Sequence, residues 1–165
     1  MKCIVLTIAS MLCVTRLFAQ WSGNTTYYNP NGSYGGSART TQFGNTTQTT
    51  FYNQNGSYGG NAQTIRSGNG TQTTFYNANG SMGGTARTSQ FGNTADTTYY
   101  NANGSFGGSS RTTIFGNQTT TYHYGANGAS AGRSVTTQFG NQTTTTHYDQ
   151  YGRPAGTTRN TVGGW

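Results

Sequence analysis

Phe75–Gly84, which read FYNANGSMGG, contain a pattern that recurs along almost the whole chain. An aromatic pair precedes a turn-forming Asn-Gly dipeptide, and a glycine pair follows it. The turn glycine recurs every 24 residues, at Gly32, Gly56, Gly80, Gly104, Gly128 and Gly152. A tyrosine keeps the same interval at Tyr28, Tyr52, Tyr76, Tyr100, Tyr124 and Tyr148. Six copies at a fixed period predict a repeat architecture.

The Asn-Gly dipeptide between β-prone residues predicts a β-hairpin, because both turn residues must tolerate a positive φ. If residues 79–80 alone form the turn, Tyr76 pairs with Gly83 and Phe75 pairs with Gly84. Each ring then covers a glycine on the neighbouring strand and restores packing that glycine lacks. The same strands also suit the rungs of a β-solenoid, with tyrosine stacked on tyrosine. The sequence leaves both arrangements open.

A second turn is predicted where a Gly-Asn dipeptide follows the glycine pair, at Gly68, Gly92 and Gly116. Each copy is therefore expected to form a strand, an Asn-Gly turn, a second strand and a Gly-Asn turn. No window has the period of an amphipathic helix. The predicted fold class is all-β, with six tandem 24-residue two-strand repeats arranged as a hairpin meander or a solenoid.

Residues 1–20 have the features of a secretory signal peptide. Lys2 supplies a positive charge, a mostly apolar run follows it, and residues 17–19 offer a cleavage site. We therefore expect a mature protein that is secreted, periplasmic or displayed on the cell surface. The mature protein has no cysteine and no segment apolar enough to span a membrane as a helix.

Residues 21–165 are predicted to form one β-repeat domain. Its first repeat lacks three residues, and its last repeat has Tyr151 where the others carry the turn asparagine. Shortened and divergent copies are typical of the two ends of a repeat array. The domain has seven arginines and two aspartates, a formal net charge of +5, and very few aliphatic residues. Aromatic rings, threonine and backbone hydrogen bonds are expected to stabilise it.

Two histidines form the one group in the repeats with metal-ligating character. His123 and His147 lie 24 residues apart, and Asp149 follows two residues after His147. Either repeat arrangement brings the histidines close together, which is compatible with a metal site. The interpretation that we favour is that each histidine is a flat ring in the place of Phe75 or Tyr99. We therefore predict no metal and no cofactor.

Catalysis is not expected, because the domain has only two aspartates and two histidines for acid–base chemistry and no cysteine nucleophile. Four arginines keep the 24-residue register, at Arg39, Arg87, Arg111 and Arg159. On a repeat they form a basic stripe beside the tyrosines, which suits nucleic acid, lipopolysaccharide or an acidic polysaccharide. The same stripe is compatible with a row of charges that only keeps the protein soluble. The rows of threonine suggest an ice-binding plane, although threonine is also a common strand residue.

Gly140–Arg153, which read GNQTTTTHYDQYGR, resemble the YD repeat of RHS-type proteins. Seven residues match that pattern, namely Gly140, Asn141, Thr143, Tyr148, Asp149, Gly152 and Arg153. The resemblance implies β-hairpins on a secreted or surface protein. The architecture and composition are also similar to curli-type bacterial amyloid, in which two-strand repeats make up a secreted protein rich in Gly, Asn and Gln.

We expect a secreted, non-enzymatic structural repeat protein of the cell surface or extracellular matrix. It would act as a self-assembling fibre subunit or adhesin, with the tyrosine rows as its packing spine. The alternative is a monomeric secreted module that binds a polyanion, a glycan or ice. Glycosylation sequences occur at the turn asparagines, including Asn79, and glycans there would block stacking. Self-assembly therefore favours a bacterial source.

Overall fold

The computed structural model describes residues 21–162, which form an all-β fold. Twelve antiparallel strands and no helix occur in this part of the protein. Their bounds are β1 Trp21–Tyr28, β2 Tyr34–Phe43, β3 Thr46–Tyr52, β4 Tyr58–Ser67, β5 Gly70–Asn77, β6 Met82–Phe91, β7 Thr94–Asn101, β8 Phe106–Phe115, β9 Gln118–Gly125, β10 Ser130–Phe139, β11 Gln142–Tyr148 and β12 Pro154–Val162. The predicted signal peptide, residues 1–20, lies outside the described residues.

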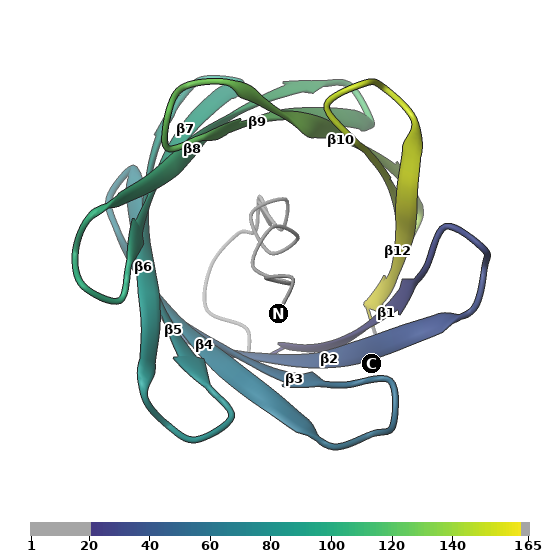
Figure 1. The fold of residues 1–165 in the computed structure, drawn as a ribbon, viewed down its shortest axis with the longest axis horizontal. Coiled ribbons are helices and arrows are strands. Elements are labelled where there is room, and N and C mark those ends of the chain that lie inside the picture. Colours follow the sequence, from purple (N-terminus) through teal and green to yellow (C-terminus); the bar gives the residue numbers. More distant parts are fainter. Residues whose placement is uncertain (1–20, 163–165) are drawn as a thin grey trace.

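Each strand pairs with its neighbours in sequence, and β12 pairs with β1, so the sheet closes into a barrel (Figure 1). The all-β prediction is confirmed. The solenoid alternative is wrong, because consecutive strands are antiparallel partners in one closed sheet. Within residues 21–162, no helix is long and apolar enough to cross a membrane.

The Asn-Gly turns are wider than predicted. In the β5–β6 hairpin, the Asn77 N–H donates to the Ser81 carbonyl at 2.8 Å, and the Gly80 N–H donates to the Asn77 carbonyl at 2.9 Å. Three residues therefore form the loop, and Gly80, with φ +80°, takes the left-handed position at its end. The prediction of a two-residue turn was therefore wrong, and Tyr76 pairs with Met82 rather than with Gly83.

A β-bulge between Phe75 and Tyr76 then restores the expected register. Phe75 lies opposite Gly84, as predicted. The wider turn shifts the strand pairing by one residue, and the bulge shifts it back by one residue. The β3–β4 hairpin behaves in the same way, since Phe51 lies opposite Gly60 while Tyr52 pairs with Tyr58.

The Gly-Asn turns form at the other end of the barrel, as predicted. Between β4 and β5, Ser67 pairs with Gly70, and Gly68 has φ +57°. The turn carbonyls also join consecutive hairpins, since the Asn45 carbonyl accepts the Arg66 N–H at 2.9 Å. The two kinds of turn therefore mark the two rims of the barrel.

Alternate residues of each strand face the inside of the barrel. In β2, Ala38 and Thr40 are buried whereas Arg39 is exposed. Each odd-numbered strand contributes one inward ring, and together these are Tyr27, Phe51, Phe75, Tyr99, His123 and His147, each opposite a glycine. The inner wall combines these rings with Gly, Ala, Ser and Thr, which is why few aliphatic residues are needed.

The glycine opposite each ring has a second constraint from the next strand. Gly84 has φ +138°, and a Cβ placed there would collide with the Tyr100 carbonyl oxygen of β7. The second glycine of the pair is therefore required both by its backbone conformation and by the close approach of a neighbouring carbonyl.

Candidate functional site

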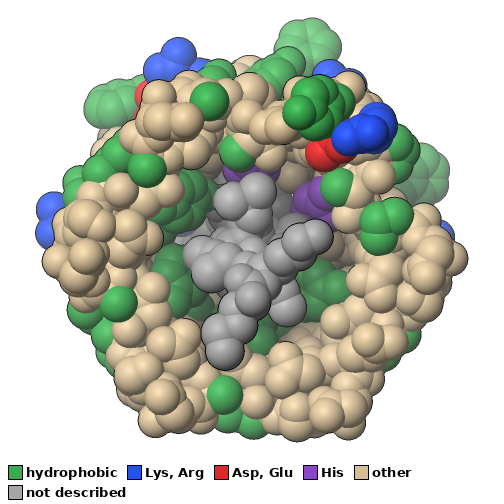
Figure 2. Space-filling view, in the orientation of Figure 1, with side chains coloured by type: hydrophobic (Ala, Val, Ile, Leu, Met, Phe, Trp, Pro, Cys, Tyr) green, Lys and Arg blue, Asp and Glu red, His purple; other side chains and the backbone are tan. Residues whose placement is uncertain are grey.

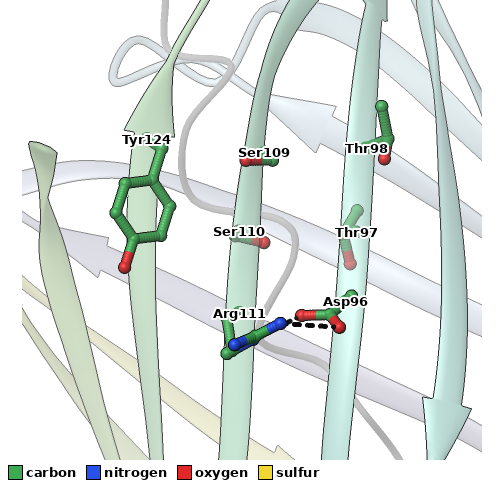
Figure 3. Close-up of a pocket in the computed structure, with 7 residues that line it drawn as sticks. All are labelled: Asp96, Thr97, Thr98, Ser109, Ser110, Arg111 and Tyr124. Carbon is green, nitrogen blue, oxygen red and sulfur yellow. Dashed lines mark hydrogen bonds and ion pairs between the residues drawn. The ribbon is translucent and has the colours of Figure 1, made fainter. Parts of the chain in front are cut away.

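A pocket of about 330 Å³ lies on the barrel wall across β7, β8 and β9 (Figure 3). It is lined by Asp96, Thr97, Thr98, Ser109, Ser110, Arg111 and Tyr124. Three of these lining residues differ from the others in having a charge or a ring. They are Asp96, Arg111 and Tyr124, and two of them, Arg111 and Tyr124, belong to the rows that the sequence singled out.

Asp96 and Arg111 are direct cross-strand partners and form a bidentate ion pair. The Arg111 guanidinium donates through Nε to Asp96 Oδ1 at 2.7 Å and through its terminal nitrogen to Oδ2 at 3.2 Å. The hydrogen bond from Arg111 lowers the pKa of the Asp96 carboxyl, and the carboxylate in turn raises the pKa of Arg111. The pair therefore stays ionised and holds the guanidinium in a fixed orientation.

Between this ion pair and Tyr124 the floor of the pocket is made of small hydroxyl residues. Thr98 pairs with Ser109, and Ser109 pairs on its other side with Tyr124. In Figure 3 the Tyr124 ring lies on the strand beside Ser109, and the Asp96–Arg111 pair lies further along the two strands that carry Thr98 and Ser109. A ring, hydroxyls and a fixed ion pair together suit a polar ligand that has one flat face, such as a sugar.

The predicted arginine row lies on the outer wall of the barrel. Arg39, Arg87 and Arg159 are exposed in β2, β6 and β12. The Arg87 guanidinium carbon lies 5.9 Å from the centre of the Tyr100 ring, and that of Arg159 lies 5.8 Å from the Tyr28 ring. These distances are typical of cation–π contacts. The pocket at Arg111 thus has related arrangements elsewhere on the wall.

Two charged residues of this surface were missed from the sequence. Arg133 lies with its guanidinium 4.9 Å from the centre of the Tyr148 ring. Val135 occupies the place of the arginine in this repeat, 24 residues after Arg111. Arg133 lies two residues before Val135 and so faces the same side of the strand, and this spacing was the signal in the sequence. Asp96 would have been found by pairing β7 with β8 about the turn at Gly104. We call Arg39, Arg87, Arg111, Arg133, Arg159 and their neighbouring tyrosines the arginine–tyrosine belt.

The predicted tyrosine row faces outward rather than into the packing core. Tyr28, Tyr52, Tyr76 and Tyr100 pair with Tyr34, Tyr58, Met82 and Phe106 across their hairpins. Tyr124 and Tyr148 hold the same strand position in β9 and β11. The preceding residue of each aromatic pair faces inward instead, and the role of the tyrosine row as the packing spine of a fibre stays a prediction. The turn glycines Gly32, Gly56, Gly80, Gly104, Gly128 and Gly152 lie at the adjoining rim, with φ from +77° to +80°.

The two histidines meet on the inner wall, where Figure 2 shows histidine side chains facing the interior. The Ser134 hydroxyl oxygen lies 3.0 Å from His123 Nε2 and 2.9 Å from His147 Nδ1. His147 Nε2 continues the series of hydrogen bonds to Thr158 Oγ1 at 2.8 Å. Asp149 takes no part, because its carboxylate accepts hydrogen bonds from residues 151 and 153 in the last turn. The three residues considered for a metal site are therefore not assembled.

The rings of the inner wall are uncharged near neutral pH. Burial lowers the pKa of His123, and burial together with the nearby charge of His123 lowers the pKa of His147 to about 4. Burial raises the pKa of Tyr27 to about 12 and also raises the pKa of Tyr99, whose bond to Ser110 acts in the opposite direction. These groups serve as neutral hydrogen-bonding rings.

Three of the four polar rings on the inner wall are matched to hydroxyl residues 11 positions later, and Tyr27, which is followed by Ala38, is the exception. Tyr99 bonds Ser110 at 3.1 Å, and the two histidines bond Ser134 and Thr158. Phe51 and Phe75, which have no polar atom, are instead followed by Ala62 and Ala86. Five of the six inward rings follow this correlation, which was a signal in the sequence for the row of inward rings.

The fold and these contacts define a closed antiparallel barrel that has an arginine–tyrosine belt outside and hydrogen-bonded rings inside. No protein-family model, no curated protein and no solved structure matches the sequence. The similarities to YD repeats and to curli-type repeats therefore remain resemblances.

Proposed function

We propose that this is a secreted, non-enzymatic binding protein that recognises an acidic polysaccharide through the arginine–tyrosine belt. The observation that carries the proposal is the repeated placement of an exposed arginine beside a tyrosine ring, as in Arg87–Tyr100, Arg133–Tyr148 and Arg159–Tyr28. Arginine pairs with carboxylate or sulfate groups, and the tyrosine offers a flat apolar surface to a sugar ring.

The charge balance supports an acidic ligand. The described residues include seven arginines against Asp96 and Asp149, and both aspartates are paired with an arginine. Arg39, Arg87, Arg133 and Arg159 belong to neither ion pair, so their charges are available to an anionic polymer. Attraction of this kind raises the local concentration of a polyanion and speeds its association.

The 24-residue repeat supports binding at several points. If the six two-strand repeats act as equivalent units, the belt offers related sites around the wall at regular intervals. A polymer with many identical groups gains avidity from such sites, even where each contact is weak. A small monovalent anion would gain no such advantage.

Closure of the barrel favours this function over fibre growth by strand addition. Adding a strand requires unpaired backbone groups at a sheet edge. Every one of the strands β1 to β12 has two partners. A surface or matrix location remains part of the proposal, with the belt as the attachment surface.

The test is a titration of the purified protein with polygalacturonate, and with neutral dextran as the control polymer. Arg87→Gln removes one belt charge beside a tyrosine ring, whereas Arg66→Gln removes one exposed charge outside the belt. We expect the Arg87→Gln variant to bind polygalacturonate about fivefold more weakly, and the matched Arg66→Gln variant to change by less than about twofold. Equal losses in the two variants, or equal binding of dextran, would overturn the proposal. Circular dichroism checks that both variants fold.

A further inference from the structure

Five Asn-Gly turns recur at the 24-residue interval, and a sixth Asn-Gly dipeptide, Asn69-Gly70, lies at the β4–β5 turn on the other rim. Four of the five recurring turns are held by a relay of side-chain hydrogen bonds. In one, Asn79 Oδ1 accepts from the Ser81 N–H at 3.0 Å and from the Ser81 hydroxyl at 2.7 Å. The Ser81 oxygen in turn accepts from the Asn77 side-chain amide at 3.0 Å. The same relay holds the other three turn asparagines, Asn31, Asn55 and Asn103.

The fifth turn cannot form this relay. Ala129 stands in the place of the serine, and Gly125 stands in the place of the first asparagine. The bond from the Ala129 N–H to Asn127 Oδ1, at 3.0 Å, is retained. The Gly128 N–H still donates to the Gly125 carbonyl at 2.9 Å, as its counterparts do in the other turns. The five turns therefore have the same backbone hydrogen bonds, and they differ in how many hydrogen bonds hold the asparagine side chain.

Asparagine followed by glycine is prone to deamidation, because glycine has no side group to hinder the attack of its own nitrogen. The Gly128 nitrogen would attack Cγ of Asn127, forming a new C–N bond. The bond between Cγ and Nδ2 of Asn127 breaks, and the amide group leaves as ammonia with the proton from Gly128. Water then opens the cyclic imide to aspartate or isoaspartate. The reaction needs only water as a co-reactant.

The attack requires the asparagine side group to rotate until Cγ meets the glycine nitrogen. In the serine-containing turns this rotation breaks two bonds to the Ser hydroxyl and amide, and in the fifth turn it breaks one. We propose that Asn127 deamidates fastest of the five asparagines at the 24-residue turn position, and that the Asn-Ser relay protects the other four, Asn31, Asn55, Asn79 and Asn103. Each conversion adds one negative charge at the rim of a protein whose domain charge is +5.

The protein itself contains the matched comparison. Asn79, Asn103 and Asn127 are each preceded by alanine and followed by glycine, so the immediate neighbours are the same, and the fifth turn differs only at Gly125 and Ala129. The full-length protein is incubated at mildly alkaline pH, and peptide mass spectrometry follows the gain of about 1 Da at each asparagine. A parallel sample in urea gives the rates without the fold.

We expect Asn127 to deamidate about fivefold faster than Asn79 in the folded protein, the effect of losing one neutral hydrogen bond. In urea the two rates should become equal. Ser81→Ala should raise the rate at Asn79 to that of Asn127, and Gly125→Asn/Ala129→Ser should slow Asn127. Equal rates in the folded wild-type protein, or a faster Asn79, would overturn the proposal without reference to any variant.

Discussion

Ser134 and His147 are joined by a hydrogen bond of 2.9 Å on the inner wall, and the same hydroxyl contacts His123 at 3.0 Å. A serine hydroxyl has one proton, so it can donate to only one of the two imidazoles, and at least one imidazole must donate its own N–H to the serine oxygen. The tautomers of the two rings are therefore coupled, and the bond from His147 to Thr158 extends the coupling to a fourth residue.

This hydrogen-bond network makes the barrel sensitive to acid. The pKa of His147 is about 4 in the folded protein, against about 6.5 for a free histidine, so the unfolded protein binds more protons between these values. Stability is present above pH 6.5 and is lost as the pH falls toward 4, by at most about 3 kcal/mol. Urea unfolding across this range measures the loss. His147→Phe/Thr158→Ala, which copies the Phe75 and Ala86 arrangement, should remove most of it. A wild-type midpoint that is constant over this range would contradict the expectation.

The Gly84 backbone should tolerate no larger residue. Gly84→Ala places a Cβ against the Tyr100 carbonyl at φ +138°, and we expect a loss of about 2–3 kcal/mol in the free energy of unfolding. Gly80→Asn is the matched control, because open space surrounds Gly80 and asparagine tolerates its conformation. Urea denaturation should show a much smaller loss for Gly80→Asn, and equal losses would mean that the carbonyl approach is unimportant.

The matching of rings to hydroxyls should be transferable. Phe75→Tyr introduces a hydroxyl beside Ala86, which has no side-chain hydrogen-bonding group. We expect a loss of about 1–3 kcal/mol in the free energy of unfolding. Adding Ala86→Ser recreates the Tyr99–Ser110 pair, which is bonded at 3.1 Å, and should recover about 1 kcal/mol. A double-mutant cycle of unfolding free energies measures the coupling. Additive effects would show that the correlation is accidental.

Asp96 should restrain the belt at Arg111. Asp96→Asn removes the carboxylate that pairs with Arg111, so we expect binding of polygalacturonate to strengthen by about twofold or more. The free energy of unfolding should change little, since both residues are well exposed and such pairs contribute little to stability. Titration at low and high salt checks this, because the gain should shrink at high salt. Weaker binding would instead assign Asp96 a direct contact with the ligand.

The hairpins could be predicted because their signals are local. The Asn-Gly and Gly-Asn dipeptides mark the turns, and the pairing of Phe75 with Gly84 follows from counting outward from Gly80. The true turn length could not be counted in this way. The three-residue loop and the bulge at Tyr76 shift the register in opposite directions, so the pairing beyond them is the same in both descriptions.

It was harder to predict which residue of each aromatic pair faces the inside of the barrel. Phe75 and Tyr76 are both large and aromatic, and the residues on either side of them are polar, so alternation alone does not say which ring is inside. The bulge decides it by turning Phe75 and Gly84 to the same side. The match between polar rings and later hydroxyls, such as Tyr99 with Ser110, contains this information and extends over 11 residues.

Closure of the sheet into a barrel could not be predicted from the sequence. It depends on the pairing of Gly23 with Val162, which lie at opposite ends of the described residues and share no motif. The arginine pattern was visible as a 24-residue row, but the contribution of Arg133 and Asp96 depended on strand register. Local chemistry therefore predicted the units, and long-range pairing determined how they were assembled.

The contact between β1 and β12 also determines when the protein becomes protected from aggregation with other molecules of the same protein. Until the last strand is present, both ends of the growing sheet expose unpaired backbone groups, which are templates for another molecule. Closing so distant a contact is slow compared with forming each hairpin. A molecule cut short before Pro154 keeps two open ends indefinitely. Aggregation should accordingly be a property of incomplete or damaged molecules, with the intact ring as the form that resists it.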